Sequence, residues 1–221
     1  MEQASWRSKL IAAGLGIAIP LLWILAQVAT ITCLELGNFQ WFTIFFGVHW
    51  SGLLLLLAIM PLYNKLPRKI KIGTFFRKRS ILPIISVFII YLAFNIYGLL
   101  SGTHQEIGVK LLIQTPWPYV FPVFLTALVL TPLGEEILFR GYIANAFPLE
   151  KKWGMIASAL VTTALFSCIH FQYEHLVSFL EIAALGFVFI WARIHSGGLG
   201  LPIFLHFLAS VLNIISGLLL P

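Results

Sequence analysis

The chain has 221 residues, of which 60% are hydrophobic and only 10% are charged, and its formal net charge is +6. Soluble domains carry about 25% charged residues, so this composition excludes an ordinary soluble protein and indicates a polytopic membrane protein. The basic residues gather in short loops, a distribution that sets membrane topology and does not indicate nucleic-acid binding. Apolar segments recur without a soluble-sized interval, which predicts a single integral membrane domain over residues 1–221.

Seven segments are long and apolar enough to cross ~30 Å of hydrocarbon, which predicts an all-α polytopic transmembrane helix bundle. These predicted spans cover residues 10–33, 41–63, 81–100, 118–147, 153–172, 175–195 and 199–220. The first follows Arg7 and Lys9, as in a signal peptide, but its length favours a retained helix. The fourth contains Pro122 and Pro132, so we expect a kink or a break in it.

The loop charges predict the orientation. Twelve basic residues fall on one predicted side of the membrane, including Arg77, Lys78, Arg79 and Arg193, whereas Lys110 alone lies on the other side. Cytoplasmic loops carry the excess of Lys and Arg, so the N-terminus is predicted to be cytoplasmic and the C-terminus external. The basic loop over residues 64–80 is predicted to be a topology signal, with contact to anionic headgroups as the alternative.

The acidic and thiol residues limit the possible chemistry. All eight acidic residues are Glu, and the absence of Asp excludes a paired-aspartate intramembrane protease. No Gly-x-Ser-Gly turn is present, which disfavours a rhomboid-type serine protease. Cys33 and Cys168 are single thiols in apolar surroundings and are predicted to be buried and inert, with a disulfide between them left open.

Two carboxylates and a guanidinium interrupt the fourth span, at Glu135, Glu136 and Arg140. A charged side chain at the centre of a membrane helix costs about 2.5–3.5 kcal/mol, so such groups must be paired or hydrated. Glu136 and Arg140 are four residues apart and are predicted to pair on one helix face. Glu135 points elsewhere, and as an unpaired carboxylate in low dielectric it is a candidate acceptor of a proton from water. A structural Glu–Arg clamp is the alternative.

Two later spans add polar groups at depth. Phe166 and His170 share a face at i, i+4 in the fifth span. His206 lies in the seventh span, with Ser210 one turn later and Asn213 two turns later on roughly the same face. A single buried His is usually a packing residue, but two in a chain that also buries Glu-Glu-Arg favour a functional site. Glu181 is a further carboxylate within a span, and the sequence names no partner for it.

These motifs, Glu135-Glu136-x-x-x-Arg140, Phe166-x-x-x-His170 and a His on a late helix, resemble the CPBP (Abi) family. This family includes CAAX prenyl endopeptidases and bacteriocin-processing or self-immunity proteins. The resemblance covers roughly residues 118–215 as a catalytic core, and the neighbouring Phe139-Arg140-Gly141-Tyr142 strengthens it. It implies an intramembrane glutamate endopeptidase with no covalent intermediate, no metal and no cofactor. The substrate would be a membrane-associated or prenylated protein or peptide. The protein itself would lie in the lipid of a bacterial cell membrane.

Carried onto this chain, the resemblance implies that Glu135 and His170 hold and activate a water. Arg140 would pair with Glu136 or position the substrate, and His206 would stabilise the oxyanion. The family usually has Asn or Asp four residues after its last His, but here that position is Ser210. Ser210 or Asn213 would have to replace it, and Phe166 would be a further contact to substrate or oxyanion.

Three other functions remain open from the sequence. A metal-dependent hydrolase would use Glu135, His170 and His206 as ligands, although the His-Glu-x-x-His signature is absent. A non-catalytic immunity or scaffold protein would explain the serine at position 210. A transporter is weaker, because the polar residues gather in the second half of the chain without a matching first half.

Overall fold

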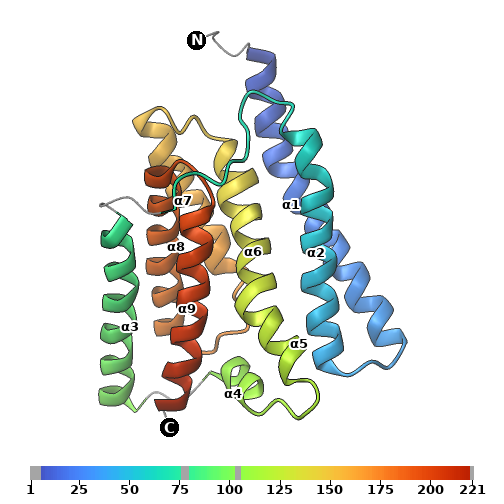
Figure 1. Cartoon of the computed structure of the whole chain (residues 1–221), viewed down its shortest axis with the longest axis vertical. Coiled ribbons are helices and arrows are strands. Elements are labelled where there is room, and N and C mark those ends of the chain that lie inside the picture. The colour runs from blue at the N-terminus through green and yellow to red at the C-terminus, as the bar shows by residue number, and fades with distance from the viewer. Residues whose placement is uncertain (1–5, 76–79, 103–105, 220–221) are drawn as a thin grey trace.

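The computed structural model describes residues 6–75, 80–102 and 106–219, and all regular structure in these ranges is helical. The predicted all-α polytopic bundle is confirmed (Figure 1). The helices are α1 (Trp6–Leu36), α2 (Trp41–Tyr63), α3 (Ile81–Ser101), α4 (Ile107–Ile113), α5 (Val120–Leu125), α6 (Thr131–Glu136), α7 (Lys152–Cys168), α8 (Leu176–Ser196) and α9 (Gly200–Leu219). Two π-helical segments, η2 (Thr126–Leu130) and η3 (Ile137–Ile143), flank α6.

Among the described residues, six helices are long and apolar enough to span a membrane, and α7 is shorter. The helix predicted over residues 153–172 ends at Cys168. Helix α7 therefore has 17 residues and is only about 25 Å long. The residues that follow, 169–175, are polar in part and non-helical. The chain still reverses direction at α7, because the start of α1 and the end of α9 lie at opposite ends of the bundle (Figure 1). The described residues therefore form an integral membrane protein with six helices of spanning length and the shorter α7.

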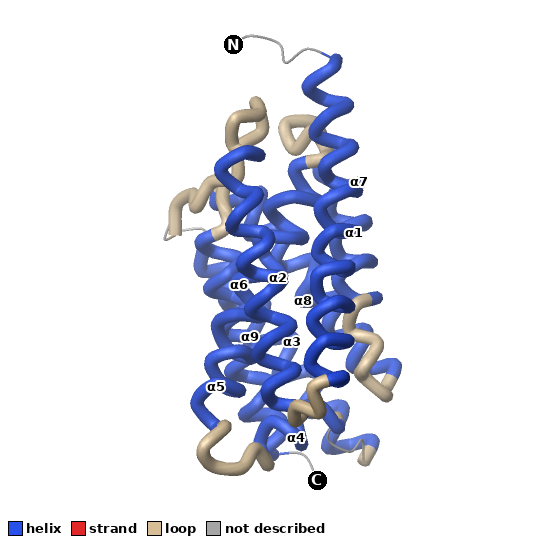
Figure 2. The backbone as a smooth tube through the Cα atoms, turned by 90° about the vertical axis from the view of Figure 1, so that its right-hand side faces the viewer, coloured by secondary structure: helices blue, strands red, loops and turns tan. Residues whose placement is uncertain are grey.

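The helices run along the long axis of the molecule and the loops gather at its two ends (Figure 2). The helical stretch from α5 to η3 lies between α2 and α9 in Figure 1 and is among the most buried parts of the bundle. Helix α1 packs on α2 and η3, whereas α8 packs on α3, α7 and α9. The outer faces of α1 and α3 are exposed and apolar, as helices that face lipid require.

The fourth span does not break at its prolines. It runs without interruption from Val120 to Ile143, and its pitch changes instead at the two π segments. Pro132 is the second residue of α6, directly after η2, so its missing N–H falls where the helix changes from π to α pitch. Thr126 donates its hydroxyl to the carbonyl of Pro122 at 2.7 Å. Single π turns inside membrane helices are frequent at functional sites, because they redirect the side chains that follow.

Residues 64–75 form a strap that crosses one end of the bundle from α2 to the turn between α8 and α9. The backbone N–H groups of Leu199 and Gly200 donate to the carbonyls of Lys71 and Ile72, both at 2.8 Å.

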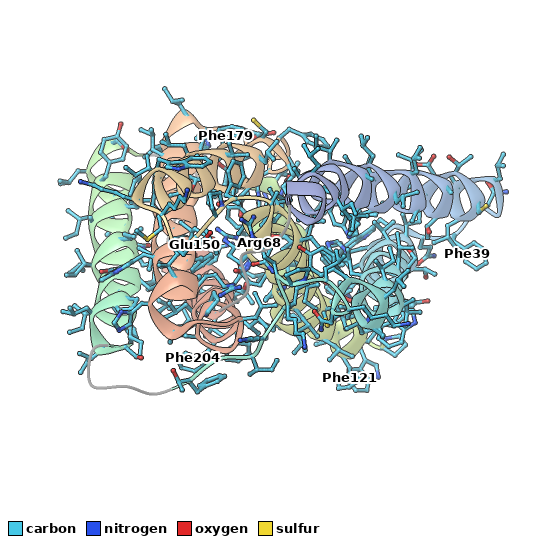
Figure 3. All side chains as sticks on the ribbon, turned by 90° about the horizontal axis from the view of Figure 1, so that it is seen from above. Phe39, Arg68, Phe121, Glu150, Phe179 and Phe204 are labelled. Carbon is cyan, nitrogen blue, oxygen red and sulfur yellow. The ribbon has the colours of Figure 1, made fainter. Side chains whose placement is uncertain are left out.

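Arg68, within this strap, donates to two carbonyls that follow η3, those of Asn145 (3.0 Å) and Ala146 (3.1 Å). Seen along the bundle, Arg68 and Glu150 lie over the central helices (Figure 3). Arg68 therefore has a structural role besides its charge. Arg77, Lys78 and Arg79 lie outside the described residues.

One sequence-based assignment is wrong, and one residue has a further role. Arg193 lies in the last turn of α8, at the end of the sixth predicted span as expected, and it is only 6% exposed. It donates to the backbone oxygen of Arg140 (3.0 Å) and to the side-chain oxygen of Asn145 (3.1 Å), so it is part of the packed end of α8. Cys33 and Cys168 are free and exposed instead of buried.

Replacing Gly198 with alanine is expected to destabilise the fold by about 1–3 kcal/mol. A Cβ at this position would overlap the backbone of Gly73 and Ile72 in the strap, and backbone cannot rotate away as a side chain does. Thermal unfolding in detergent measures the effect. Gly108→Ala in α4 is the control, because an added Cβ there meets nothing within 4 Å. Equal unfolding midpoints for the two variants would contradict the close packing of the strap.

Candidate active site

The centre of the bundle contains a fully buried ion pair. Glu136 and Arg140 are both 0% exposed, and Arg140 donates from Nη1 to Glu136 Oε1 at 2.8 Å. The predicted i, i+4 pair therefore exists, although η3, which begins directly after Glu136, has a wider turn than an α-helix. A buried pair needs further hydrogen bonds to offset its desolvation. Arg140 has one, from Nη2 to the carbonyl of Gly186 in α8 at 3.0 Å.

Three aromatic rings surround the Arg140 guanidinium. Its central carbon lies 4.5 Å from the ring centroid of Phe166, 5.2 Å from that of Phe189 and 5.9 Å from that of Phe139. Cation–π contact with desolvated rings is worth up to about 2 kcal/mol. Phe166 is thus a wall of this Arg140 site, and its ring also contacts those of His170 (4.7 Å) and His206 (5.6 Å).

Glu136 also orients His206. The Nδ1 atom of His206 lies 3.0 Å from Glu136 Oε1, the same oxygen that accepts from Arg140. Because the ionised carboxylate can only accept, Nδ1 carries the proton and donates. The other ring nitrogen of His206, Nε2, therefore has a lone pair when the ring is neutral. It faces Glu135, with 3.8 Å between Nε2 and Glu135 Oε2.

His170 has the same tautomer for a different reason. Its Nδ1 lies 2.7 Å from the backbone oxygen of Phe166, one turn earlier at the end of α7. A carbonyl can only accept, so Nδ1 donates and Nε2 is directed elsewhere. That Nε2 lies 4.0 Å from Glu135 Oε2. A single carboxylate oxygen from α6 is thus faced by imidazole nitrogens from the turn after α7 and from α9.

These separations are too long for direct hydrogen bonds. Within the described residues, Glu135 Oε2 has no hydrogen-bond partner although it is buried. Polar groups 3.8 and 4.0 Å apart that make no direct hydrogen bond can be joined through a water. With both imidazoles neutral, the two glutamates and Arg140 carry a net charge of −1, which one added proton neutralises. The cluster can therefore hold a water and take up its proton.

Ser210 and Asn213 differ in position. Ser210 lies one turn after His206, is half-buried, and has no hydrogen bond within the described part of the chain. Asn213 lies about 10 Å from His206 along α9 and lines a separate polar cavity with Glu181 and Tyr173. Besides Phe166, seven site residues were predicted. The structure brings five of them together and places Asn213 apart; the five are Glu135, Glu136, Arg140, His170 and His206.

Several contributors were missed from sequence. Phe189 stacks on His206 with ring centroids 5.0 Å apart and an angle of 22°. His49 in α2 was not among the predicted site residues. Its Nδ1 lies 2.8 Å from the carbonyl of Phe45, and the charge of Glu135 acts on its ring. A Phe in an apolar helix carries no local signal. His49, in contrast, lies well inside the second span. A histidine at that depth could have been recognised from the sequence as a candidate site residue.

No group of three His, Cys, Asp or Glu side chains has the arrangement of metal ligands in residues 6–75, 80–102 and 106–219. Glu135, His170 and His206 approach such a set, but the Nε2-to-oxygen distances of 3.8 and 4.0 Å exceed the roughly 3.4 Å between ligands of a tetrahedral zinc ion.

Residues 116–212 match the family model described as type II CAAX prenyl endopeptidase Rce1-like, which confirms the resemblance found in the sequence. An Escherichia coli protein described as an uncharacterized 24.3 kDa protein is 41% identical over 108 residues, or 49% of this chain and 50% of that protein. The chain thus spans about half the length of the curated relative it matches. No solved structure matches the chain.

Proposed function

Because residues 116–212 carry the sequence of the Rce1-like CAAX prenyl endopeptidases, we propose that this protein is an intramembrane glutamate endopeptidase. It hydrolyses a peptide bond in a membrane-associated or prenylated protein or peptide, with a water activated by Glu135 and His170. One observation carries the proposal: Glu135 Oε2, buried and without a protein partner among the described residues, faces the Nε2 atoms of His170 and His206.

The reaction begins with a water between Glu135 and His170. Glu135 accepts one proton as the water oxygen attacks the scissile carbonyl, and the lone pair on His170 Nε2 accepts the other hydrogen bond and fixes the direction of attack. General base catalysis of this kind contributes about 10²–10⁴-fold. The proton on Glu135 then passes to the leaving amine, so no covalent intermediate forms.

His206 stabilises the oxyanion in its protonated form. Its Nδ1 is held by Glu136, so the ring presents Nε2 to the site in a fixed direction. A proton taken up from solvent on Nε2, separate from the one that Glu135 accepts from the water, makes this atom a donor toward the developing negative charge. Arg140 and Glu136 then act as positioning residues, because they hold the ring and contact no reacting atom.

A second oxyanion donor is assigned to Ser210. It is one turn from His206 and has no other hydrogen bond in the described chain. Asn213 is the weaker choice, because it lies beside Glu181 and interacts with Tyr173. Phe166 supports the site as a packing surface.

The proposal extends to the whole chain. Residues 1–221 form a single integral membrane domain with residues 118–215 as its catalytic core, the N-terminus is cytoplasmic, and the membrane is that of a bacterial cell. The partners are membrane lipids and the peptide substrate. No nucleic acid, metal or cofactor takes part.

The test uses the purified full-length protein in proteoliposomes with a set of membrane-anchored peptides, some farnesylated at a C-terminal CAAX sequence and some not. Cleavage is expected to continue after strong chelation and after treatment with serine- and thiol-directed reagents. Loss of cleavage on chelation, with recovery on zinc addition, would replace this mechanism with a metal-dependent one. If Glu135→Gln supports the biological role as well as the parent does, the protein is a non-catalytic membrane partner.

A further inference from the structure

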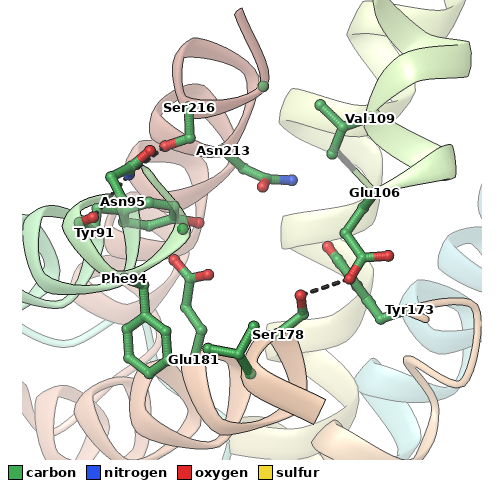
Figure 4. Close-up of a pocket in the computed structure, with 13 residues that line it drawn as sticks. Tyr91, Phe94, Asn95, Glu106, Val109, Tyr173, Ser178, Glu181, Asn213 and Ser216 are labelled. Atoms are coloured by element: carbon green, nitrogen blue, oxygen red, sulfur yellow. Dashed lines mark hydrogen bonds between the residues drawn. The ribbon is translucent and has the colours of Figure 1, made fainter. Parts of the chain in front are cut away.

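The polar cavity that Asn213 lines lies apart from the cluster of Glu135, His170 and His206. It has a volume of about 70 Å³ between α3, α4, α8 and α9. Its polar lining includes Tyr91, Asn95, Tyr173, Glu181, Asn213 and Ser216. Figure 4 shows the carboxylate of Glu181 and the amide of Asn213 directed into it. We name it the Glu181 cavity.

The polar groups of the Glu181 cavity do not satisfy one another. Asn95 donates to Ser216 at 2.7 Å, but its side-chain oxygen is buried without a partner in the described residues. Glu181 has no hydrogen bond or ion pair to any described residue. Buried polar groups in a membrane protein are paired or hydrated, and ionisable ones mark functional positions. A cavity of this volume with several polar partners holds ordered water.

One side chain separates this cavity from the Glu135–His170 pair. The ring of Tyr173 lies 5.9 Å from the ring of His170, measured between centroids. On its other side Tyr173 lines the cavity, as Asn213 does. The Tyr173 phenol therefore contacts both compartments.

The cavity is also close to bulk water. Helix α7 ends early, and residues 169–175 continue without helical structure, with Gln172 and Glu174 exposed. Irregular backbone within a membrane is tolerated only where it is buried in protein or lines water. Glu106, at the start of α4, fixes this segment by accepting from the backbone N–H groups of Glu174 (2.9 Å) and His175 (3.3 Å) and from the hydroxyl of Ser178 (2.5 Å).

We propose that the Glu181 cavity is the route by which water reaches Glu135 and His170. Water enters at the end of the bundle where α4 and the C-terminus lie, and Tyr173 separates the cavity from the catalytic pair. The inference rests on the proposed function only in naming the use of that water, namely as the hydrolytic co-substrate. It also gives Glu181 a role, which is to keep the cavity hydrated in an apolar bundle.

The first experiment asks whether the cavity is wet. The full-length protein with Cys33→Ser and Cys168→Ser carries either Asn213→Cys or Ile215→Cys and is exposed to Ag⁺ in proteoliposomes. Position 215 is the matched control on the same helix, because it is two residues away and 47% exposed on the outer face. Thiols react as thiolates, which form in water and not in hydrocarbon, so we expect Asn213→Cys to react at least about tenfold faster. Equal rates would overturn the proposal.

The second experiment asks whether the cavity is the route. Glu135→Cys is placed in the same background, alone or with Glu181→Met or Glu181→Gln. Methionine has about the length of glutamate but presents no polar group to the cavity, whereas glutamine keeps its volume and polarity. We expect Glu181→Met, and not Glu181→Gln, to lower the Ag⁺ rate at position 135 about tenfold. An unchanged rate with Glu181→Met would move the route elsewhere and end the proposal.

Neither labelling experiment depends on proteolysis, so a failure of the proposed function and a failure of the water route are distinguishable. With Glu135 intact, Glu181→Met is further expected to slow peptide cleavage about tenfold while Glu181→Gln cleaves at the parent rate.

Discussion

Glu135→Gln is expected to lower the rate of peptide cleavage at least about 1000-fold. The amide has the size of the carboxylate but cannot accept a proton from water, so the general base is lost. The fold should survive, because Glu135 Oε2 makes no hydrogen bond with any described residue. The measurement is the initial rate on a membrane-anchored peptide in proteoliposomes, with the folded fraction determined by thermal unfolding of the same sample.

Glu150→Gln is the matched control for this variant. Glu150 is 66% exposed and lies 3.8 Å from Arg68 at the end of the bundle, so the same chemical change there should leave the cleavage rate unaltered. A Glu135→Gln protein that is folded and cleaves within tenfold of the parent rate would remove Glu135 from the chemistry and with it the glutamate mechanism.

Arg140→Leu is expected to destabilise the folded protein by about 3–5 kcal/mol. The substitution leaves Glu136, which is 0% exposed, as an uncompensated buried charge and also removes the hydrogen bond to Gly186. Loss of the guanidinium further removes the cation that the rings of Phe166 and Phe189 enclose. Unfolding by denaturant in detergent, followed by helical circular dichroism, measures the change.

The double variant Glu136→Gln, Arg140→Leu separates the charge from the packing. If the unpaired carboxylate is the main cause, removing its charge should recover a large part of the lost stability. A double variant no more stable than Arg140→Leu would show that the enclosed guanidinium, and not the ion pair, holds this region together.

The sequence predicted the residues that charge and helical spacing determine. Glu136 and Arg140 were expected to pair because i, i+4 neighbours share a face, and they do. His170 and His206 were expected at the same place because polar groups within apolar spans must find partners, and the structure groups them around Glu135. The first argument rests on helical spacing and the second on the cost of polar groups in lipid. Neither requires knowing which helices are neighbours.

What sequence could not provide depends on which helices are neighbours. Asn213 shares a face with His206, but it lies two turns away opposite α3 and α8, so helical spacing alone misplaced it. Arg193 ends the sixth predicted span, and the sequence did not show that Asn145 and the Arg140 carbonyl, its hydrogen-bond partners, lie beside it. The end of α7 at Cys168 was missed because residue 169 is still apolar, and the π turns around α6 have no local signal except Pro132.

A single oxygen, Glu136 Oε1, accepts both from Arg140 and from the ring of His206. A substitution at Glu136 or Arg140 therefore affects both the orientation of His206 and the stability of the fold. A descendant that abandons hydrolysis but keeps its bundle is free to change Glu135 or His170, whereas loss of Glu136 or Arg140 removes the scaffold as well. In a lineage of inactive relatives, the first glutamate of the pair is then the variable one and the second is the one selection retains.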